Sequence, residues 1–96
     1  MKEIYFVPTN ECMFWRESMG EPTEDFYKWM WNSIEQNGIV NPLLGMKEGE
    51  FVRVRIGNTR LKAANELGST TVPMILLKNS EEWKKYFDEY SAVPVG

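Results

Sequence analysis

The sequence predicts an α+β domain of about four short strands and three helices. Two observations support this fold class. Apolar and charged residues alternate at 51–56, which is typical of a half-buried strand. At 23–37 the large apolar residues recur at the spacing of an amphipathic helix. Because 96 residues provide one modest hydrophobic core, we expect a single domain that spans residues 1–96.

The stretch 51–77 combines a strand, a turn, a helix and a second strand. The first strand is expected to end at Gly57, which permits backbone geometry that a side chain would forbid, and Asn58 or Thr59 is predicted to cap the following helix. Gly68 supplies the left-handed residue that ends this helix. The apolar run behind it predicts a buried strand.

Two further strands are expected, at 4–7 and at 39–44, and a hairpin-like link at 45–50 follows the second. The helix at 23–37 has Thr23 as its expected cap.

A last helix is predicted to begin at Asn79 or Ser80. Its aromatic stripe, which we interpret as core, consists of Trp83, Tyr86, Phe87 and Tyr90.

The composition is that of a soluble globular protein, with 43% hydrophobic and 26% charged residues. A single cysteine, Cys12, excludes an internal disulfide and fits a reducing compartment. No apolar run approaches the roughly 20 residues of a membrane span. We therefore expect a cytoplasmic protein with no membrane segment.

The charge and the missing histidine limit the chemistry. A net charge of −3 argues against a protein that mainly grips a nucleic-acid backbone, so direct DNA binding is not expected to be strong. The densest basic group flanks the turn after the 51–56 strand and consists of Arg53, Arg55, Arg60 and Lys62. Arg53 and Arg55 also fit the solvent face of that strand. Without histidine, a Ser-His-Asp or Cys-His nucleophile is excluded. No spacing typical of a metal site is present.

The turn Gly57-Asn58-Thr59-Arg60 suits an anion. The first amides of a helix have no partner inside the helix, and the helix dipole adds partial positive charge there. Arg60 would add a two-pronged donor for a phosphate or carboxylate. The same pattern occurs where the turn serves only packing and the arginine forms a surface ion pair, so both interpretations stay open.

Seven short motifs follow one another between residues 33 and 77. They are Ser33-Ile34, Gly38-Ile39, Pro42-Leu43, Gly57-x-x-Arg60, Ala63-Ala64, Leu67-Gly68 and Val72-Pro73. In this order and spacing they resemble the ParB/sulfiredoxin-like family, also called the ParB-like nuclease domain. The resemblance implies a small ParB/sulfiredoxin-like domain, with a mixed sheet of about four strands packed with three helices.

The resemblance also implies roles for individual residues. The family's Gly-x-x-Arg loop contacts the phosphates of a nucleotide, which assigns that contact to Gly57, Asn58, Thr59 and Arg60. Segment 3–16 fits the first strand and loop more loosely. There Arg16 lies near an arginine that turns toward the ligand, and Glu11 lies near the carboxylate that kinase-like members use.

Two departures from the family pattern matter. ParB proteins usually carry an acidic residue and two arginines where this chain has Asn58, Thr59 and Arg60, so the metal-linked contact of that acidic residue is not carried over. Sulfiredoxins place a reactive cysteine directly after the glycine, where this chain has Asn58. Sulfiredoxin chemistry is therefore not expected. The segment after Leu77 is also too short for the DNA-reading and dimerisation segments of a full ParB.

Three functions are compatible with these observations. The first is a stand-alone domain that binds a nucleotide, CTP or ATP/ADP, or another phosphate ligand at the Gly57–Arg60 loop. The second is an enzyme, either a phosphoryl-transfer or nucleotide-hydrolysing protein or a ParB-like nuclease. In it Glu11 would act as a general base or help to hold Mg²⁺. The alternative, that Glu11 is only a solvated loop residue, is the one that the sequence favours. The third is a protein-interaction module that uses Trp29 or the Glu11–Gly20 loop.

Overall fold

The computed structural model describes residues 3–15, 22–82 and 84–86. The elements follow the order β1 (Tyr5–Pro8), the 3-10 helix η1 (Thr9–Glu11), β2 (Cys12–Met13), α1 (Glu24–Asn37), β3 (Leu43–Glu48), β4 (Phe51–Ile56), α2 (Asn58–Glu66), β5 (Thr71–Leu76) and the 3-10 helix η2 (Ser80–Glu82). Among these residues, no helix is long and apolar enough to cross a membrane.

The strands form one mixed sheet in the order β1-β5-β3-β4-β2. β1 pairs with β5 and β3 pairs with β4 in antiparallel fashion, whereas β3 with β5 and β2 with β4 are parallel. The predicted α+β class and mixed sheet are confirmed, but the sheet has five strands instead of four. The additional strand, β2, has only two residues, which is too short to show an alternating pattern.

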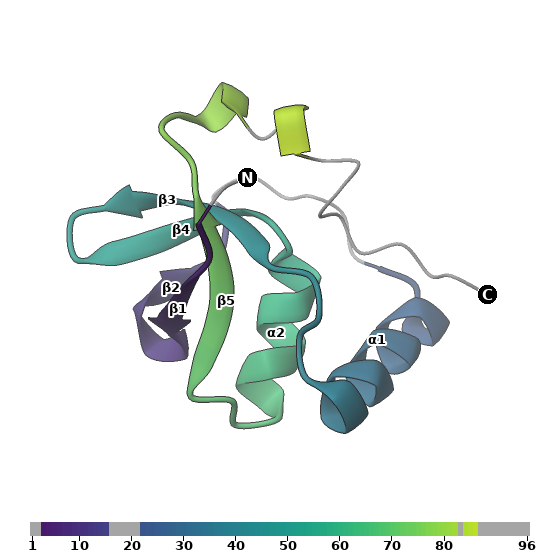
Figure 1. The fold of residues 1–96 in the computed structure, drawn as a ribbon. Helices are drawn as coiled ribbons and strands as arrows, with labels where there is room; N and C mark the ends of the chain where they lie inside the picture. Colours follow the sequence, from purple (N-terminus) through teal and green to yellow (C-terminus); the bar gives the residue numbers. More distant parts are fainter. Residues whose placement is uncertain (1–2, 16–21, 83, 87–96) are drawn as a thin grey trace.

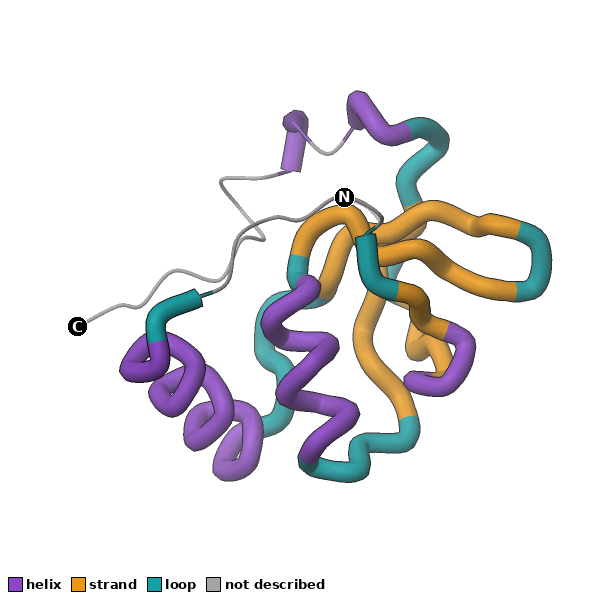
Figure 2. Tube along the Cα trace, turned by 180° about the vertical axis from the view of Figure 1, so that it is seen from behind, coloured by secondary structure: helices purple, strands orange, loops and turns teal. Residues whose placement is uncertain are grey.

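α1 and α2 form two successive layers on one side of the sheet. α2 packs directly on the sheet, and α1 lies on the outer side of α2, as the two opposite views show (Figures 1 and 2). Alternate residues of each strand point to opposite faces, so the sheet contributes to two clusters. The cluster under α2 is formed by Val7, Leu43, Val52, Val54, Leu61, Ala64, Val72 and Met74. The cluster on the other face is formed by Leu44, Ile56, Ile75 and Leu77.

A third cluster joins the two helices. Met30 and Ile34 of α1 pack on Ala63 of α2, which is fully buried. α1 begins where the sequence predicts, because the Thr23 hydroxyl oxygen accepts a hydrogen bond from the Phe26 amide at 3.1 Å. The position of α2 on the sheet and of α1 on α2 brings the first turns of both helices near the segment that follows β2.

The strand predicted at 39–44 was placed too early. β3 runs over Leu43–Glu48, and the predicted link at 45–50 is reduced to a turn at Gly49 and Glu50. Pro42 explains the shift, because proline has no amide hydrogen to donate to a strand ladder and the strand begins directly after it.

The prediction for the last helix is confirmed at its beginning. The Asn79 side-chain oxygen accepts hydrogen bonds from the amides of Glu81 and Glu82, at 3.0 and 3.1 Å. Tyr86, in the helical residues 84–86, packs against the cluster around Leu44 and Ile75. The other three aromatic residues of the predicted stripe lie outside the described residues.

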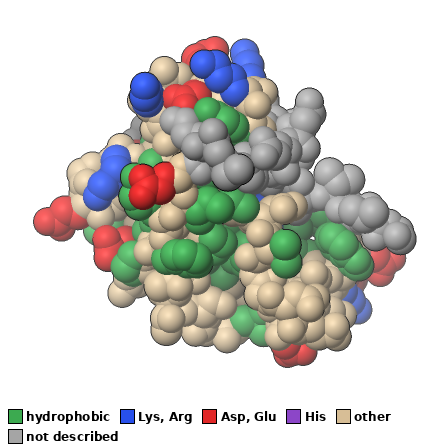
Figure 3. Space-filling model, in the orientation of Figure 1, with side chains coloured by type: hydrophobic (Ala, Val, Ile, Leu, Met, Phe, Trp, Pro, Cys, Tyr) green, Lys and Arg blue, Asp and Glu red, His purple; other side chains and the backbone are tan. Residues whose placement is uncertain are grey.

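Hydrophobic side chains also reach the surface. Figure 3 shows them gathered in the middle of the face that carries β1, with charged side chains toward its rim. The most exposed aromatic residue of β1 is Phe6, at 72%. Apolar atoms make up more than half of the surface of a typical folded protein, so we assign no function to this patch.

Candidate phosphate site at the first turn of α2

α2 begins at Gly57, in the left-handed conformation with φ 106° and ψ 21°. An added Cβ at Gly57 would lie 2.6 Å from Leu43 Cγ, so both the backbone angle and the available space require glycine. The prediction that Asn58 or Thr59 caps the helix is wrong, because Gly57 is itself the cap residue and both residues lie inside the first turn. The left-handed glycine starts the helix one residue earlier than the polar residues suggested.

The first turn of α2 presents amide hydrogens that the helix does not use. The first hydrogen bond of the helix runs from the Leu61 amide to the Gly57 carbonyl oxygen at 2.9 Å. Asn58, Thr59 and Arg60 precede it, and no side chain within the described residues caps the helix start. Together with the positive end of the helix dipole, these amides favour a negatively charged group.

A hollow of about 380 Å³ opens at this turn. Its described lining residues come from the segment after β2, from the start of α1 and from the first turns of α2, and they are Phe14, Pro22, Glu24, Tyr27, Asn58, Thr59 and Lys62. The volume lies within the range of roughly 300 to 1,000 Å³ that is usual for small-molecule sites. The hollow therefore offers helix-end amides, a lysine and two aromatic rings to one ligand.

Lys62 and Tyr27 form one wall of the hollow. The Lys62 Nζ atom lies 4.8 Å from the centroid of the Tyr27 ring, a cation–π distance. The Tyr27 hydroxyl donates to the Glu66 carboxylate at 2.7 Å. Burial and this hydrogen bond raise the pKa of Tyr27 to about 12, so the ring carries no charge at neutral pH and Lys62 supplies the positive charge of this wall.

One carboxylate, Glu24, is among the described lining residues. Its Oε1 atom lies 3.2 Å from Lys28 Nζ, one helical turn away on the exposed surface of α1. A carboxylate near an anion site repels the anion unless a cation lies between them. Among residues 3–15, 22–82 and 84–86, no group of three or more acidic or cysteine side chains could hold a metal ion by itself.

Arg60 does not line this hollow. Its side chain is only 4% exposed, and its Nη1 atom donates to the carbonyl oxygens of Asn41 at 2.7 Å and Pro42 at 3.2 Å. Burial lowers the pKa of Arg60 to about 10, which leaves the guanidinium charged at neutral pH. Arg60 instead borders a second hollow of about 90 Å³, beside Trp29 and Val40.

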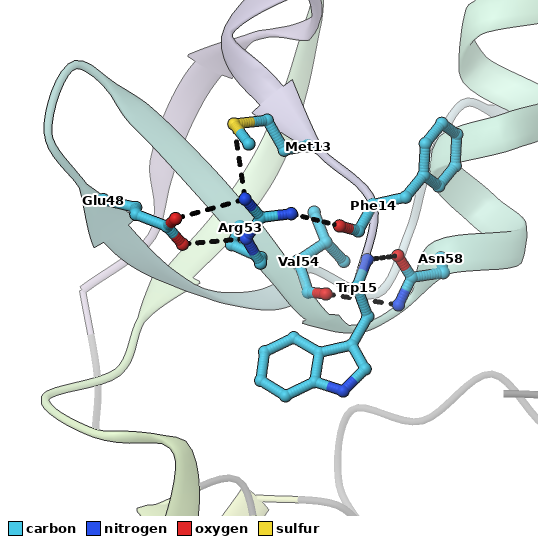
Figure 4. Close-up of polar contacts among 7 residues, drawn as sticks. All are labelled: Met13, Phe14, Trp15, Glu48, Arg53, Val54 and Asn58. Atoms are coloured by element: carbon cyan, nitrogen blue, oxygen red, sulfur yellow. Dashed lines mark hydrogen bonds and ion pairs between the residues drawn. The ribbon is translucent and has the colours of Figure 1, made fainter. Parts of the chain in front are cut away.

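The Asn58 side chain is hydrogen-bonded to the segment that follows β2. Its side-chain oxygen accepts a hydrogen bond from the Trp15 amide at 2.9 Å, and its side-chain nitrogen donates to the Val54 carbonyl oxygen at 3.2 Å (Figure 4). The side chain thus holds the neighbouring segment, while the backbone of Asn58 stays at the helix start.

Glu11 and Arg16 are not brought to the hollow by the described structure. Glu11 ends η1, is half-buried and is not among the lining residues. Burial, and to a smaller extent the negative charge of Glu11, raise the pKa of the neighbouring Cys12 thiol to about 11. Arg16 lies outside the described residues. The predicted set therefore divides: Asn58 and Thr59 line the hollow, Gly57 makes the turn before them, and Arg60 is buried away from the hollow.

The sequence contained signals for two residues that it did not assign to the site. Lys62 lies three residues after Thr59 and four after Asn58, and such positions share one face of a helix. Phe14 belongs to the Glu11–Gly20 loop, which the third predicted function uses as a contact surface. Tyr27 belongs to the amphipathic pattern at 23–37, and that pattern does not distinguish a core tyrosine from one at a site.

No protein-family model and no curated protein matches the chain. Solved structures do. The C-terminally truncated chromosome-partitioning protein ParB from Caulobacter crescentus, complexed with CTP-gamma-S, superposes with a TM-score of 0.77 over 97% of this chain and 56% of its own, at 16% identity. Sulfiredoxin from Arabidopsis thaliana superposes with a TM-score of 0.68 over 88% of this chain and 94% of its own, at 19% identity.

A free serine kinase in complex with AMP is also similar. Its TM-score is 0.64, at 16% identity, over 92% of this chain and 33% of the kinase. This chain therefore spans about half of the ParB structure and a third of the kinase structure. At these identities the likeness establishes the fold. The ParB/sulfiredoxin-like fold that the sequence motifs suggested is confirmed.

Proposed function

We propose that this chain, which has the ParB/sulfiredoxin-like fold, binds a nucleotide with its phosphates at the first turn of α2. The observation that carries the proposal is the hollow of about 380 Å³, in which Asn58 and Thr59 meet the lysine at position 62. A phosphate there would accept hydrogen bonds from helix-end amides and would be attracted by the helix dipole.

Each residue of the site has a defined part in this proposal. Gly57 makes the turn and keeps its own surface free of a side chain. The amides of Asn58 and Thr59 donate to the phosphate oxygens, and Lys62 supplies a mobile positive charge. Arg60 supports the turn from behind, since its Nη2 atom lies 3.1 Å from where a Gly57 Cβ would stand. The family motif also predicts a phosphate contact for Arg60, which would require its guanidinium to leave the carbonyl oxygens of Asn41 and Pro42. A contact from Arg16 stays a prediction from the same motif.

Two of the similar structures support a nucleotide as the ligand class, because one ParB structure holds CTP-gamma-S and one kinase structure holds AMP. We propose CTP or ATP/ADP for this chain. Mg²⁺ in proteins is commonly held by one or two carboxylates together with phosphate oxygens. Glu24 is the carboxylate within the described lining that fits such an arrangement, so a metal would enter with the phosphates.

A reaction on the bound nucleotide is a further proposal. Phosphoryl transfer or hydrolysis would need a general base, and the resemblance to kinase-like family members assigns that part to Glu11, which is not among the described lining residues of the hollow. The test is release of inorganic phosphate or a nucleoside diphosphate by wild-type chain and by Glu11→Gln. Cleavage of plasmid DNA in the same samples tests the nuclease alternative. The expected cytoplasmic location stays a prediction.

Isothermal titration tests binding directly. CTP, ATP, ADP and GTP are each titrated with and without Mg²⁺ into the wild-type chain, Lys62→Ala and Lys47→Ala. The control Lys47 is exposed on β3, is absent from the described lining of the hollow, and its substitution changes the net charge equally. We expect binding of at least one nucleotide, about tenfold weaker in Lys62→Ala and unchanged in Lys47→Ala. Equal weakening in both variants, or no binding at millimolar nucleotide, contradicts the proposal.

A second candidate, a protein-interaction module, is favoured by one observation. Trp29 is 40% exposed and Val40 is 76% exposed, and both border the hollow of about 90 Å³. Exposed tryptophan is enriched at the centres of protein interfaces. If no nucleotide binds while a partner is captured by the wild-type chain and not by Trp29→Ala, this function replaces the first.

A further inference from the structure

One peptide unit beside the hollow is held at both of its polar atoms. The carbonyl oxygen of Phe14 accepts a hydrogen bond from Arg53 Nη1 at 2.8 Å, and the amide of Trp15 donates to Asn58 Oδ1 at 2.9 Å. These two atoms belong to the same planar group, so its position and rotation are both fixed. Figure 4 shows the two side chains reaching this peptide from β4 and from the start of α2.

Arg53 is itself oriented before it reaches the peptide. Its Nε and Nη2 atoms donate to the two oxygens of Glu48, at 2.8 and 3.1 Å. This fork-to-fork geometry fixes the plane of the guanidinium, and the side chain is only 12% exposed. Trp15 adds a further restraint, because its ring lies 4.7 Å from the guanidinium carbon of Arg55. The short segment after β2 is thus fixed by side chains of β4 and α2.

The ring of Phe14 projects from the Phe14–Trp15 peptide that Arg53 and Asn58 hold in place. The rings of Phe14 and Trp15 leave the chain in different directions (Figure 4). Phe14 is 46% exposed and lines the hollow together with Asn58 and Thr59. A fixed backbone that carries a half-exposed aromatic ring beside helix-end amides offers a flat apolar surface next to a phosphate site.

We propose that the Phe14 ring is a stacking wall for the base of the nucleotide, and that Arg53 is a positioning residue that sets this wall through the Phe14–Trp15 peptide. The inference rests on the proposed nucleotide binding. Stacking tolerates many bases because each has a π-face. Phe14 would therefore increase the affinity for a nucleotide but not for a phosphate chain that carries no base. Arg53 would contact no ligand and would act only through Phe14.

The test compares two probes, CTP and sodium triphosphate, on wild-type chain, Phe14→Ala, Arg53→Ala and the double variant. Phe14→Ala is expected to weaken CTP binding about tenfold and to leave triphosphate binding unchanged. Arg53→Ala should do the same to a smaller extent. In the double variant the CTP affinity should equal that of Phe14→Ala alone, because Arg53 has nothing left to position. Lys47→Ala is the control for the lost charge.

The outcomes separate the two proposals. If wild-type chain binds neither probe, nucleotide binding and this inference both fail. If it binds CTP and Phe14→Ala changes nothing, only the inference fails. Additive losses in the double variant, or equal losses of CTP and triphosphate in Arg53→Ala, also overturn it, since Arg53 would then act on the phosphates. Should Arg53→Ala not fold, Glu48→Gln weakens the fork and must give the same selective loss of CTP.

Discussion

The guanidinium of Arg60 donates to the carbonyl oxygen of Asn41 at 2.7 Å. This bond joins the first turn of α2 to the segment that leads into β3, although the two residues are 19 positions apart. Arginine in this motif was expected to face a ligand. In the structure its hydrogen bonds to Asn41 and Pro42 point into the protein, and its Nη2 atom lies beside the Gly57 turn.

Replacing Arg60 tests this internal role. Arg60→Ala leaves the carbonyl oxygens of Asn41 and Pro42 without this donor and opens space in the interior. We expect a loss of about 2 to 4 kcal/mol in the free energy of unfolding, measured by urea denaturation. Arg60→Lys, which keeps the charge and one donor, should lose less. Unchanged stability in Arg60→Ala would show that the side chain is not anchored at these carbonyls.

Thr59→Asp separates stability from binding. An acidic residue in the first turn of a helix interacts favourably with the dipole, which is worth about 0.3 to 1 kcal/mol, so the midpoint of thermal unfolding should stay or rise. The same charge repels a phosphate, so nucleotide binding should fall at least tenfold. Thr59→Asn, of similar size and neutral, is the matched control. Retained nucleotide affinity in Thr59→Asp would place the phosphates elsewhere.

Gly57→Ala and Gly68→Ala form a matched pair. Both glycines have positive φ, 106° and 74°, but only Gly57 has atoms within 4 Å of an added Cβ. Gly68→Ala should therefore cost about 1 kcal/mol for the backbone alone. Gly57→Ala should cost about 1 to 3 kcal/mol more because of overpacking against Leu43. An equal loss in the free energy of unfolding for both variants, measured with denaturant, would mean that Leu43 shifts to make room for the new methyl group without destabilising the protein.

Cys12 should be unreactive in the folded protein. Burial raises the pKa of its thiol from 9.0 to about 11, so at pH 8 the thiolate population is about 100-fold smaller than in the unfolded chain. Folding favours the protonated thiol, and the stability gained from this is complete below pH 9 and is lost as the pH rises through 11. Labelling by a disulfide reagent at pH 8 should be slow until the chain is unfolded. Rapid labelling of folded protein would contradict this.

The sequence predicted those parts of the fold that local signals determine. The alternation at Phe51–Ile56 and the Thr23 cap of α1 are found where they were expected. β2 was missed because two residues carry no period, and it forms only through pairing with Val52 and Arg53 of β4. Local propensity contains no information on such long-range pairing.

The candidate site was predictable only in part for a similar reason. The anion-binding turn follows from one glycine and the start of one helix. The directions of Arg60 and Asn58 depend on groups distant in sequence, the carbonyl of Asn41 and the amide of Trp15. The motif alone does not determine whether an arginine at the start of α2 faces the hollow or the interior.

Phosphate binding at the first turn of α2 can be observed directly through the amide resonances of that turn. A ¹⁵N-labelled chain is titrated with CTP and with ATP, with and without Mg²⁺, and the chemical shifts of all assigned amides are followed. We expect the amide resonances of Asn58 and Thr59 to shift most, because their N–H groups would donate to the phosphates. Largest shifts around Trp29 and Val40, or no shift at millimolar nucleotide, would contradict it.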